Sequence, residues 1–162
     1  MGDAFFGLRQ KPGFHNRYLK QEDHALIEVI GATTGSETSK KYARSGLDRH
    51  MCKQIAEKIE LAMHSNKLYL NPSLSLGVLA KEISTQANYV SQVLNQTLEK
   101  NFFDYVNSLR VAHSKTLIVL GELSILDVAL ASGFNSKSSF YKAFKKETGQ
   151  TPIQYRLTEQ AK

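Results

Sequence analysis

The chain repeats itself at a spacing of about fifty residues, and this repeat limits the possible folds more than any other feature. Ala80 and Ala129 lie 49 positions apart. Further apolar positions match at an offset of 50: Val90, Val93 and Leu94 against Phe140, Ala143 and Phe144, and Phe103 and Tyr105 against Ile153 and Tyr155. Similarity at one period indicates a duplicated structural unit. We therefore expect two copies of one supersecondary motif.

Each copy has the pattern of two helices separated by a sharp turn. Apolar residues recur at i, i+3 and i+4, which is the spacing of one buried helix face. Ser84 and Gly133 occupy matching places in the turn, where the backbone must bend sharply. The change of offset falls here, with "ST" in the first copy and "GFN" in the second. The expected helices span residues 76–83 and about 86–96 in the first copy. In the second copy one helix starts at Ser124 and the next spans residues 137 to about 147.

Helix-capping residues place the helix starts. Ser75, Ser124, Ser136 and Thr151 each precede an apolar run, and Thr151 is followed by a proline that suits the first helical position. A long helix over residues 102–120 joins the two copies. We expect an all-α fold of about seven helices, in which two helix-turn-helix subdomains flank this connecting helix. Residues 49–162 form this domain, and residues 1–48, rich in Gly, Ser and Thr between 31 and 46, form an N-terminal extension or linker.

Composition excludes several classes of protein. The formal charge is +6 and the pI about 9.4, which favours anionic partners. The longest apolar runs fall well short of the roughly 20 residues of a membrane span, and no signal peptide is visible. Cys52 is the single cysteine, and nothing near His50 and Cys52 completes a zinc site. No catalytic set or phosphate-binding loop is present, so we expect a cytoplasmic protein that is not an enzyme and has no metal or cofactor.

The second helix of each copy carries a polar face that suits a DNA groove. Gln and Asn can pair with adenine, Lys can donate to guanine, and Ser can bond either. Residues 86–96 and 137–146 contain no acid, although the chain has fifteen. Lys145 and Lys146 follow the groove-facing turns and are assigned to phosphates. The residues expected to face outward and contact DNA are Gln86, Asn88, Ser91 and Gln92 in the first copy, and Lys137, Ser138, Tyr141 and Lys142 in the second.

Other readings of the same features stay open. Four lysines on one helix usually form only a solvated face, and it is the matched polar face of the first copy that favours DNA. A helical module whose lysines bind an acidic protein is the main alternative. Phe140 and Phe144 are interpreted as core residues, which leaves no apolar face for a membrane surface.

The stretch "ILDVALASGFNSKSSFYKAFKKETGQTPIQYR" (residues 125–156) resembles the signature of the AraC/XylS family of bacterial transcription regulators. The first copy agrees, with Tyr105, Asn107 and Arg110 in the family's "F-x-x-Y-x-N-x-x-R", and the resemblance covers about residues 49–157. The matching positions are Ile125, Val128, Ala129, Gly133, Phe134, Ser136, Phe140, Phe144, Lys145, Gly149, Pro152, Tyr155 and Arg156.

This resemblance implies a module whose two recognition helices enter successive major grooves, one helical turn or roughly 34 Å apart. The resemblance implies that double-stranded DNA and RNA polymerase are partners. It also implies that a sensor or effector outside this chain supplies the signal, and it is compatible with a homodimer. Its groove contacts map onto Asn88, Ser91, Gln92, Lys137, Ser138 and Lys142. The family often has Arg at the positions of Gln92 and Lys142, so its base preferences do not transfer.

Two further stretches resemble the juxtamembrane region of membrane-anchored members of that family. They are "FFGLRQ" (residues 5–10) and "KYARSGL" (residues 41–47). We therefore expect the chain to be the cytoplasmic portion of a longer sensor, with a free-standing short regulator as the alternative.

Overall fold

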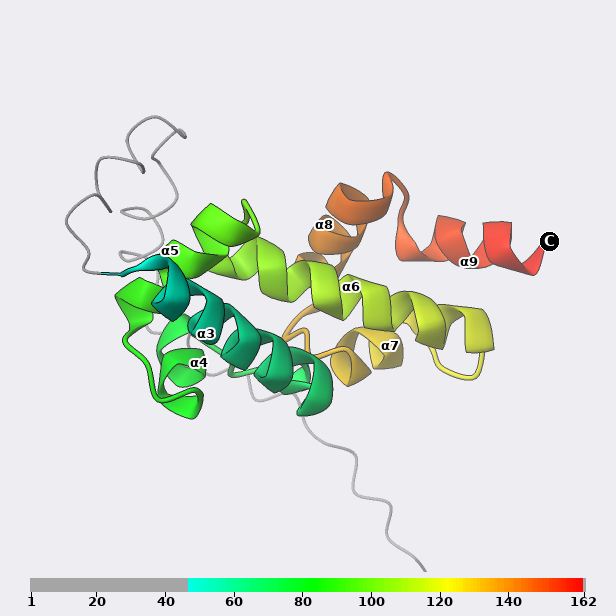
Figure 1. The fold of residues 1–162 in the computed structure, drawn as a ribbon. Coiled ribbons are helices and arrows are strands. Elements are labelled where there is room, and N and C mark those ends of the chain that lie inside the picture. Colours follow the sequence, from blue (N-terminus) through cyan, green and yellow to red (C-terminus); the bar gives the residue numbers. More distant parts are fainter. Residues whose placement is uncertain (1–46, 162) are drawn as a thin grey trace, which may run out of the picture. The chain divides into compact units, whose positions relative to one another are not determined.

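A computed structural model describes residues 47–161 of the chain, and it contains only helices and their connections within that range (Figure 1). Seven of the described elements are α-helices, so the expected all-α fold is confirmed. The elements are α3 (Arg49–Glu60), the π-helical turn η1 (Leu61–Ser65), the 3-10 turn η2 (Leu68–Leu70), α4 (Leu76–Glu82), α5 (Ala87–Thr97), α6 (Phe102–Leu120), α7 (Ile125–Ala131), α8 (Lys137–Thr148) and α9 (Pro152–Gln160). The linker and juxtamembrane predictions fall on residues 1–46, outside the described residues.

The expected caps start four of these helices. Each cap hydroxyl accepts a hydrogen bond from the backbone N–H three residues on: Ser75 from Val78, Ser124 from Asp127, Ser136 from Ser139 and Thr151 from Gln154. The capping box is complete only at Thr151, where Gln154 bonds back to the cap backbone N–H. The side chain of Asp127 instead accepts the hydroxyl of Ser124 at 2.6 Å.

Two apolar cores lie along the connecting helix α6. The first is mainly aliphatic and combines α3, η1, η2, α4 and α5 with the first turns of α6. The second combines the rest of α6 with α7 and α8, and its centre is aromatic. Phe140 lies 5.1 Å from Phe134 and 5.5 Å from Phe144 between ring centroids. Helix α6 packs against α5 and η2 in the first half of the domain and against α7, α8 and α9 in the second half. Figure 1 shows α7, α8 and α9 placed along α6.

The two turns share an unusual backbone conformation. Ser84 and Gly133 both have positive φ angles, of 51° and 85°, so the predicted sharp turn is confirmed at both places. The amide that follows each one bonds back to the small residue of the preceding helix, Thr85 to Ala80 at 2.8 Å and Phe134 to Ala129 at 3.0 Å. We call α4–α5 the first unit and α7–α8 the second unit below.

Between residues 47 and 161, no helix combines the length and the apolar character that a bilayer span requires.

Candidate nucleic-acid interface

Helix α8 presents the outer face that its sequence predicts. Phe140, Ala143 and Phe144 are buried and anchor the helix to the second core. On the other side, Lys137, Ser138 and Lys142 are exposed. Tyr141 is half-buried and packs against the second core, with its ring centroid 6.0 Å from that of Phe140. The Lys137 ammonium lies 5.3 Å from the centroid of the Tyr141 ring, within the range of a cation–π contact that holds the two side chains together.

The last turn of α8 carries Lys145 and Lys146, both exposed, and they are not equivalent. Lys146 Nζ donates to Asp104 Oδ1 of α6 at 2.6 Å, and the other oxygen of Asp104 accepts from Asn101 Nδ2 at 3.0 Å. A phosphate must therefore compete with a carboxylate for Lys146. No local pattern predicts this ion pair, because 42 residues separate Lys146 from Asp104.

Helix α5 follows its prediction only in part. Gln86, its N-cap, and Asn88, in its first turn, are exposed as expected. Ser91 and Gln92 are buried, with 9% and 4% of their surface exposed, so the prediction that they face outward is wrong.

Local hydrogen bonds and packing explain this burial. Asn95 Nδ2 donates to the carbonyl of Ser91 at 2.9 Å and to its hydroxyl at 3.4 Å. Gln92 Nε2 donates to Gln96 Oε1 at 3.3 Å, so both side chains are held along the helix. Helix α5 also packs against α3, α4 and α6. The three-residue apolar stripe predicted one covered face, whereas five consecutive residues, 90–94, are buried.

A buried arginine ties the two halves of the domain together, and sequence reasoning assigned it no role. Arg110 of α6 is 8% exposed; its Nε donates to the carbonyl of Tyr69 at 2.7 Å and its Nη2 to that of Asn71 at 2.8 Å. Its guanidinium carbon lies 5.7 Å from the centroid of the Phe134 ring. Burial lowers the pKa of Arg110 to about 10, which leaves it charged at neutral pH. In the sequence, Arg110 stands out only because it occupies the arginine position of the family motif.

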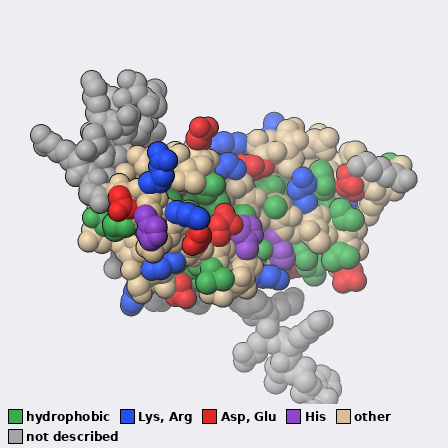
Figure 2. Space-filling model, in the orientation of Figure 1, with side chains coloured by type: hydrophobic (Ala, Val, Ile, Leu, Met, Phe, Trp, Pro, Cys, Tyr) green, Lys and Arg blue, Asp and Glu red, His purple; other side chains and the backbone are tan. Residues whose placement is uncertain are grey.

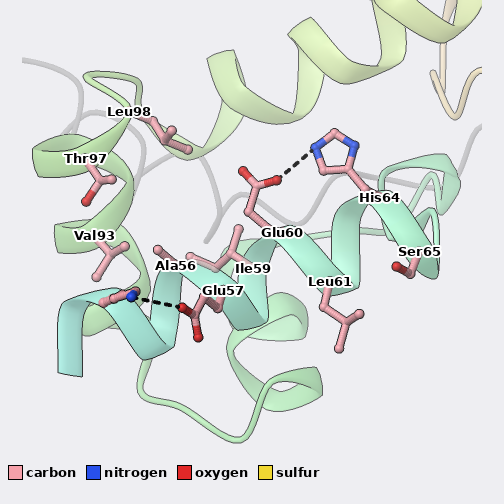
Figure 3. A pocket seen from close by; sticks show the side chains of 11 residues that line it. Ala56, Glu57, Ile59, Glu60, Leu61, His64, Ser65, Val93, Thr97 and Leu98 are labelled. Carbon is pink, nitrogen blue, oxygen red and sulfur yellow. Dashed lines mark ion pairs between the residues drawn. The ribbon is translucent and has the colours of Figure 1, made fainter. Parts of the chain in front are cut away.

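The surface around α3 differs from the outer face of α8. A hollow of about 630 Å³ lies between α3, η1 and the end of α5 (Figure 3). Its lining includes two ion pairs, Glu60 with His64 at 3.3 Å and Glu57 with Lys53 at 3.9 Å. Figure 2 shows acidic, basic and histidine side chains interspersed on the visible face. Carboxylates repel phosphate, so this hollow is a poor site for nucleic acid.

Among residues 47–161, no three His, Cys, Asp or Glu side chains are grouped so that they could hold a metal ion.

Comparison with known proteins agrees with this geometry. A family model described as a helix-turn-helix domain matches residues 79–158. The melibiose operon regulatory protein of Escherichia coli (strain K12) is 33% identical over 88 residues, which are 54% of this chain and 29% of that protein. The chain thus spans less than a third of that curated relative.

Solved structures share the fold. The C-terminal domain of AraT, a response regulator from Geobacillus stearothermophilus, is 25% identical with a TM-score of 0.58, and the match covers 70% of this chain and 88% of that one. The DNA-binding domain of the global transcriptional factor AdpA, solved in complex with a target DNA, has a TM-score of 0.59 at 18% identity over 67% and 94% of the two chains. Together with the motif over residues 125–156, these matches show that the chain belongs to the AraC/XylS family of bacterial transcription regulators and carries its DNA-binding domain.

Proposed function

We propose that the chain binds specific sequences of double-stranded DNA by placing α5 and α8 in successive major grooves. The observation that carries this proposal is the outer face of α8, where exposed Lys137, Ser138 and Lys142 stand on a helix fixed from behind by buried Phe140 and Phe144. A fixed helix with free polar side chains is what reading base edges requires. The AdpA domain, which shares this fold, was solved with its target DNA.

The outer face divides into base-reading and phosphate-binding residues. Lys137, Ser138, Tyr141 and Lys142 face the bases of one groove, and Lys145, with Lys146 when it leaves Asp104, contacts phosphates. In the other groove, Gln86 and Asn88 at the start of α5 contact bases. Ser91 and Gln92 contact a base only when their side chains break their hydrogen bonds along α5 and turn outward. RNA polymerase, a homodimer and sensor input from outside the chain follow from the family alone and stay predictions.

Selection of bound duplexes from a random library tests this function. Lys142→Ala should cost about 1–3 kcal/mol at the selected site, concentrated at one or two base pairs. Lys53→Ala is a matched control, because Lys53 is also exposed but pairs with Glu57 beside the hollow. That variant should keep both affinity and sequence preference.

A different result would point to the alternative partner. If no duplex binds in a salt-sensitive manner, the proposal fails, and an acidic protein surface becomes the better match for the lysines of α8. If Lys142→Ala weakens all sequences equally, the protein binds DNA but Lys142 reads no base.

A further inference from the structure

The two halves of the domain meet in one seam of polar contacts, which we define as the backbone of residues 69–72 together with Arg110, Gly133 and Asn135. Residues 69–72 precede α4 in the chain, and Tyr69 belongs to the first core, while Gly133 and Asn135 lie in the turn that leads into α8. Arg110 stands on α6, between the two units, and donates to two of the four carbonyls. The seam thus joins the element before α4 to the element before α8.

Gly133 brings the second turn into direct contact with the first half. A Cβ atom at this position would lie 2.8 Å from the carbonyl oxygen of Tyr69 and 2.9 Å from that of Leu70. Both distances are shorter than side-chain carbon atoms tolerate. The turn therefore rests on the backbone of residues 69–70, and neither part can move toward the other.

Asn135 adds a contact that the first unit has no means to make. The amides of Thr85 and Phe134 make equivalent turn bonds, and Gln86 and Ser136 are the two helix caps. One residue is left over in the second turn, Asn135, and its Nδ2 donates to the carbonyl of Pro72 at 2.9 Å. The one residue by which the second turn is longer than the first, Asn135, therefore makes a hydrogen bond between the two halves of the domain.

We propose that this seam sets the distance and rotation between α5 and α8, and thereby the separation of half-sites that the protein accepts on DNA. The proposal rests on the two-groove function proposed above. Adding one base pair between the half-sites increases their separation by roughly 3.4 Å and rotates one relative to the other by about 35° around the DNA axis. A rigid seam cannot follow that change, so the DNA must deform or one helix must leave its groove.

Binding to a selected operator and to versions with one base pair added or removed between its half-sites tests this inference. Wild-type protein should lose at least about tenfold in affinity at either altered spacing, by analogy with the cost of deforming DNA. Asn135→Ala, at an exposed position that leaves the core intact, and Arg110→Met should bring the three affinities to within about threefold of one another. Thermal unfolding confirms that each variant is folded.

Arg156→Met is the matched control. The Nη2 of Arg156 donates to the carbonyl of Leu123 at 2.7 Å. This substitution therefore removes a similar hydrogen bond that does not involve residues 69–72. It should keep the spacing preference of the wild type. If Asn135→Ala and Arg110→Met both keep that preference too, the seam does not set the spacing, and the inference fails even where stability falls. If the wild type binds equally well after one half-site is scrambled, the two-groove function itself fails.

Discussion

The two helix-turn-helix units share one plan and differ where they meet their surroundings. Ser84 and Gly133 both turn the chain with a positive φ angle, yet Ser84 is exposed and Gly133 is buried against the backbone of Tyr69. Serine is tolerated at the first turn because its side chain has open space. The geometry of the turn explains why both residues have a positive φ angle. The packing between the two halves of the domain explains why position 133 is a glycine.

The second helices of the two units, α5 and α8, differ in the same way. Helix α8 keeps its outer face open and charged, while α5 buries Ser91 and Gln92 and has no charged residue. The positions of α5 that match Lys145 and Lys146 at the offset of 50 are Asn95 and Gln96. The duplication thus preserves the scaffold, and we expect electrostatic attraction to DNA to come mainly from the second unit.

The largest expected difference between the units lies in their cores. Phe140 and Val90 are matching anchors with no exposed surface. Phe140→Ala should lower the free energy of unfolding by about 4 kcal/mol, because it leaves a cavity among Phe134 and Phe144, and Val90→Ala should cost about half as much. Urea unfolding measures both, and equal losses would contradict the view that the second core depends on its aromatic centre.

The turn residues give the next prediction. Gly133→Ala should cost about 3 kcal/mol, because the new Cβ meets two carbonyl oxygens and the residue must hold a positive φ angle. Ser84→Ala keeps a Cβ at an exposed turn and should change stability by less than about 1 kcal/mol. A loss in Gly133→Ala of only about 1 kcal/mol, the cost of holding a Cβ at a positive φ angle, would show that contact with residues 69–70 is not the reason for glycine at this position.

Local signals in the sequence predicted the scaffold well. The four hydroxyl caps and the limits of α6 depend on residues within a few positions of one another, and all are found where expected. The contacts of Arg110 with Tyr69 and of Lys146 with Asp104 join residues about forty positions apart. No periodicity encodes such pairs, because they exist only after the two halves have packed.

The candidate site divides along the same line. One apolar stripe sufficed to orient α8, because Phe140, Ala143 and Phe144 are its buried residues. Of the residues predicted to face outward, Tyr141 alone also packs against the second core. Orienting α5 also required knowing that α3, α4 and α6 pack on it, and that Asn95 and Gln96 bond to the side of the helix predicted to be free. The wrong orientation of Ser91 and Gln92 follows from this missing tertiary information.

A smaller effect concerns the salt dependence of DNA binding. Lys145→Ala should reduce the slope of log affinity against log salt by about 0.9, since one phosphate contact is lost. Gln96→Ala, at the position in α5 that matches Lys146, should leave the slope unchanged. Asp104→Asn releases Lys146 from its 2.6 Å ion pair and should steepen the slope. A slope that falls equally in the first two variants would place as much of the charge contact on α5 as on α8.

The smallest expected effect is a pH dependence confined to the first half of the domain, because no histidine follows His113 in the chain. Burial, and then the charge of Lys67, lower the pKa of His113, whose ring meets Tyr69 edge-on at 6.1 Å. The unfolded chain therefore binds the proton more readily, so stability should fall as the pH drops below about 6.5, the ordinary pKa of histidine, and stay level above it.

Urea unfolding at pH 7.5 and 5.5 tests this prediction. The free energy of unfolding should fall less between the two pH values in His113→Gln than in the wild type, whereas His50→Gln, which alters an exposed histidine of α3, should keep the full loss. An unchanged loss in His113→Gln would assign the acid sensitivity to other groups.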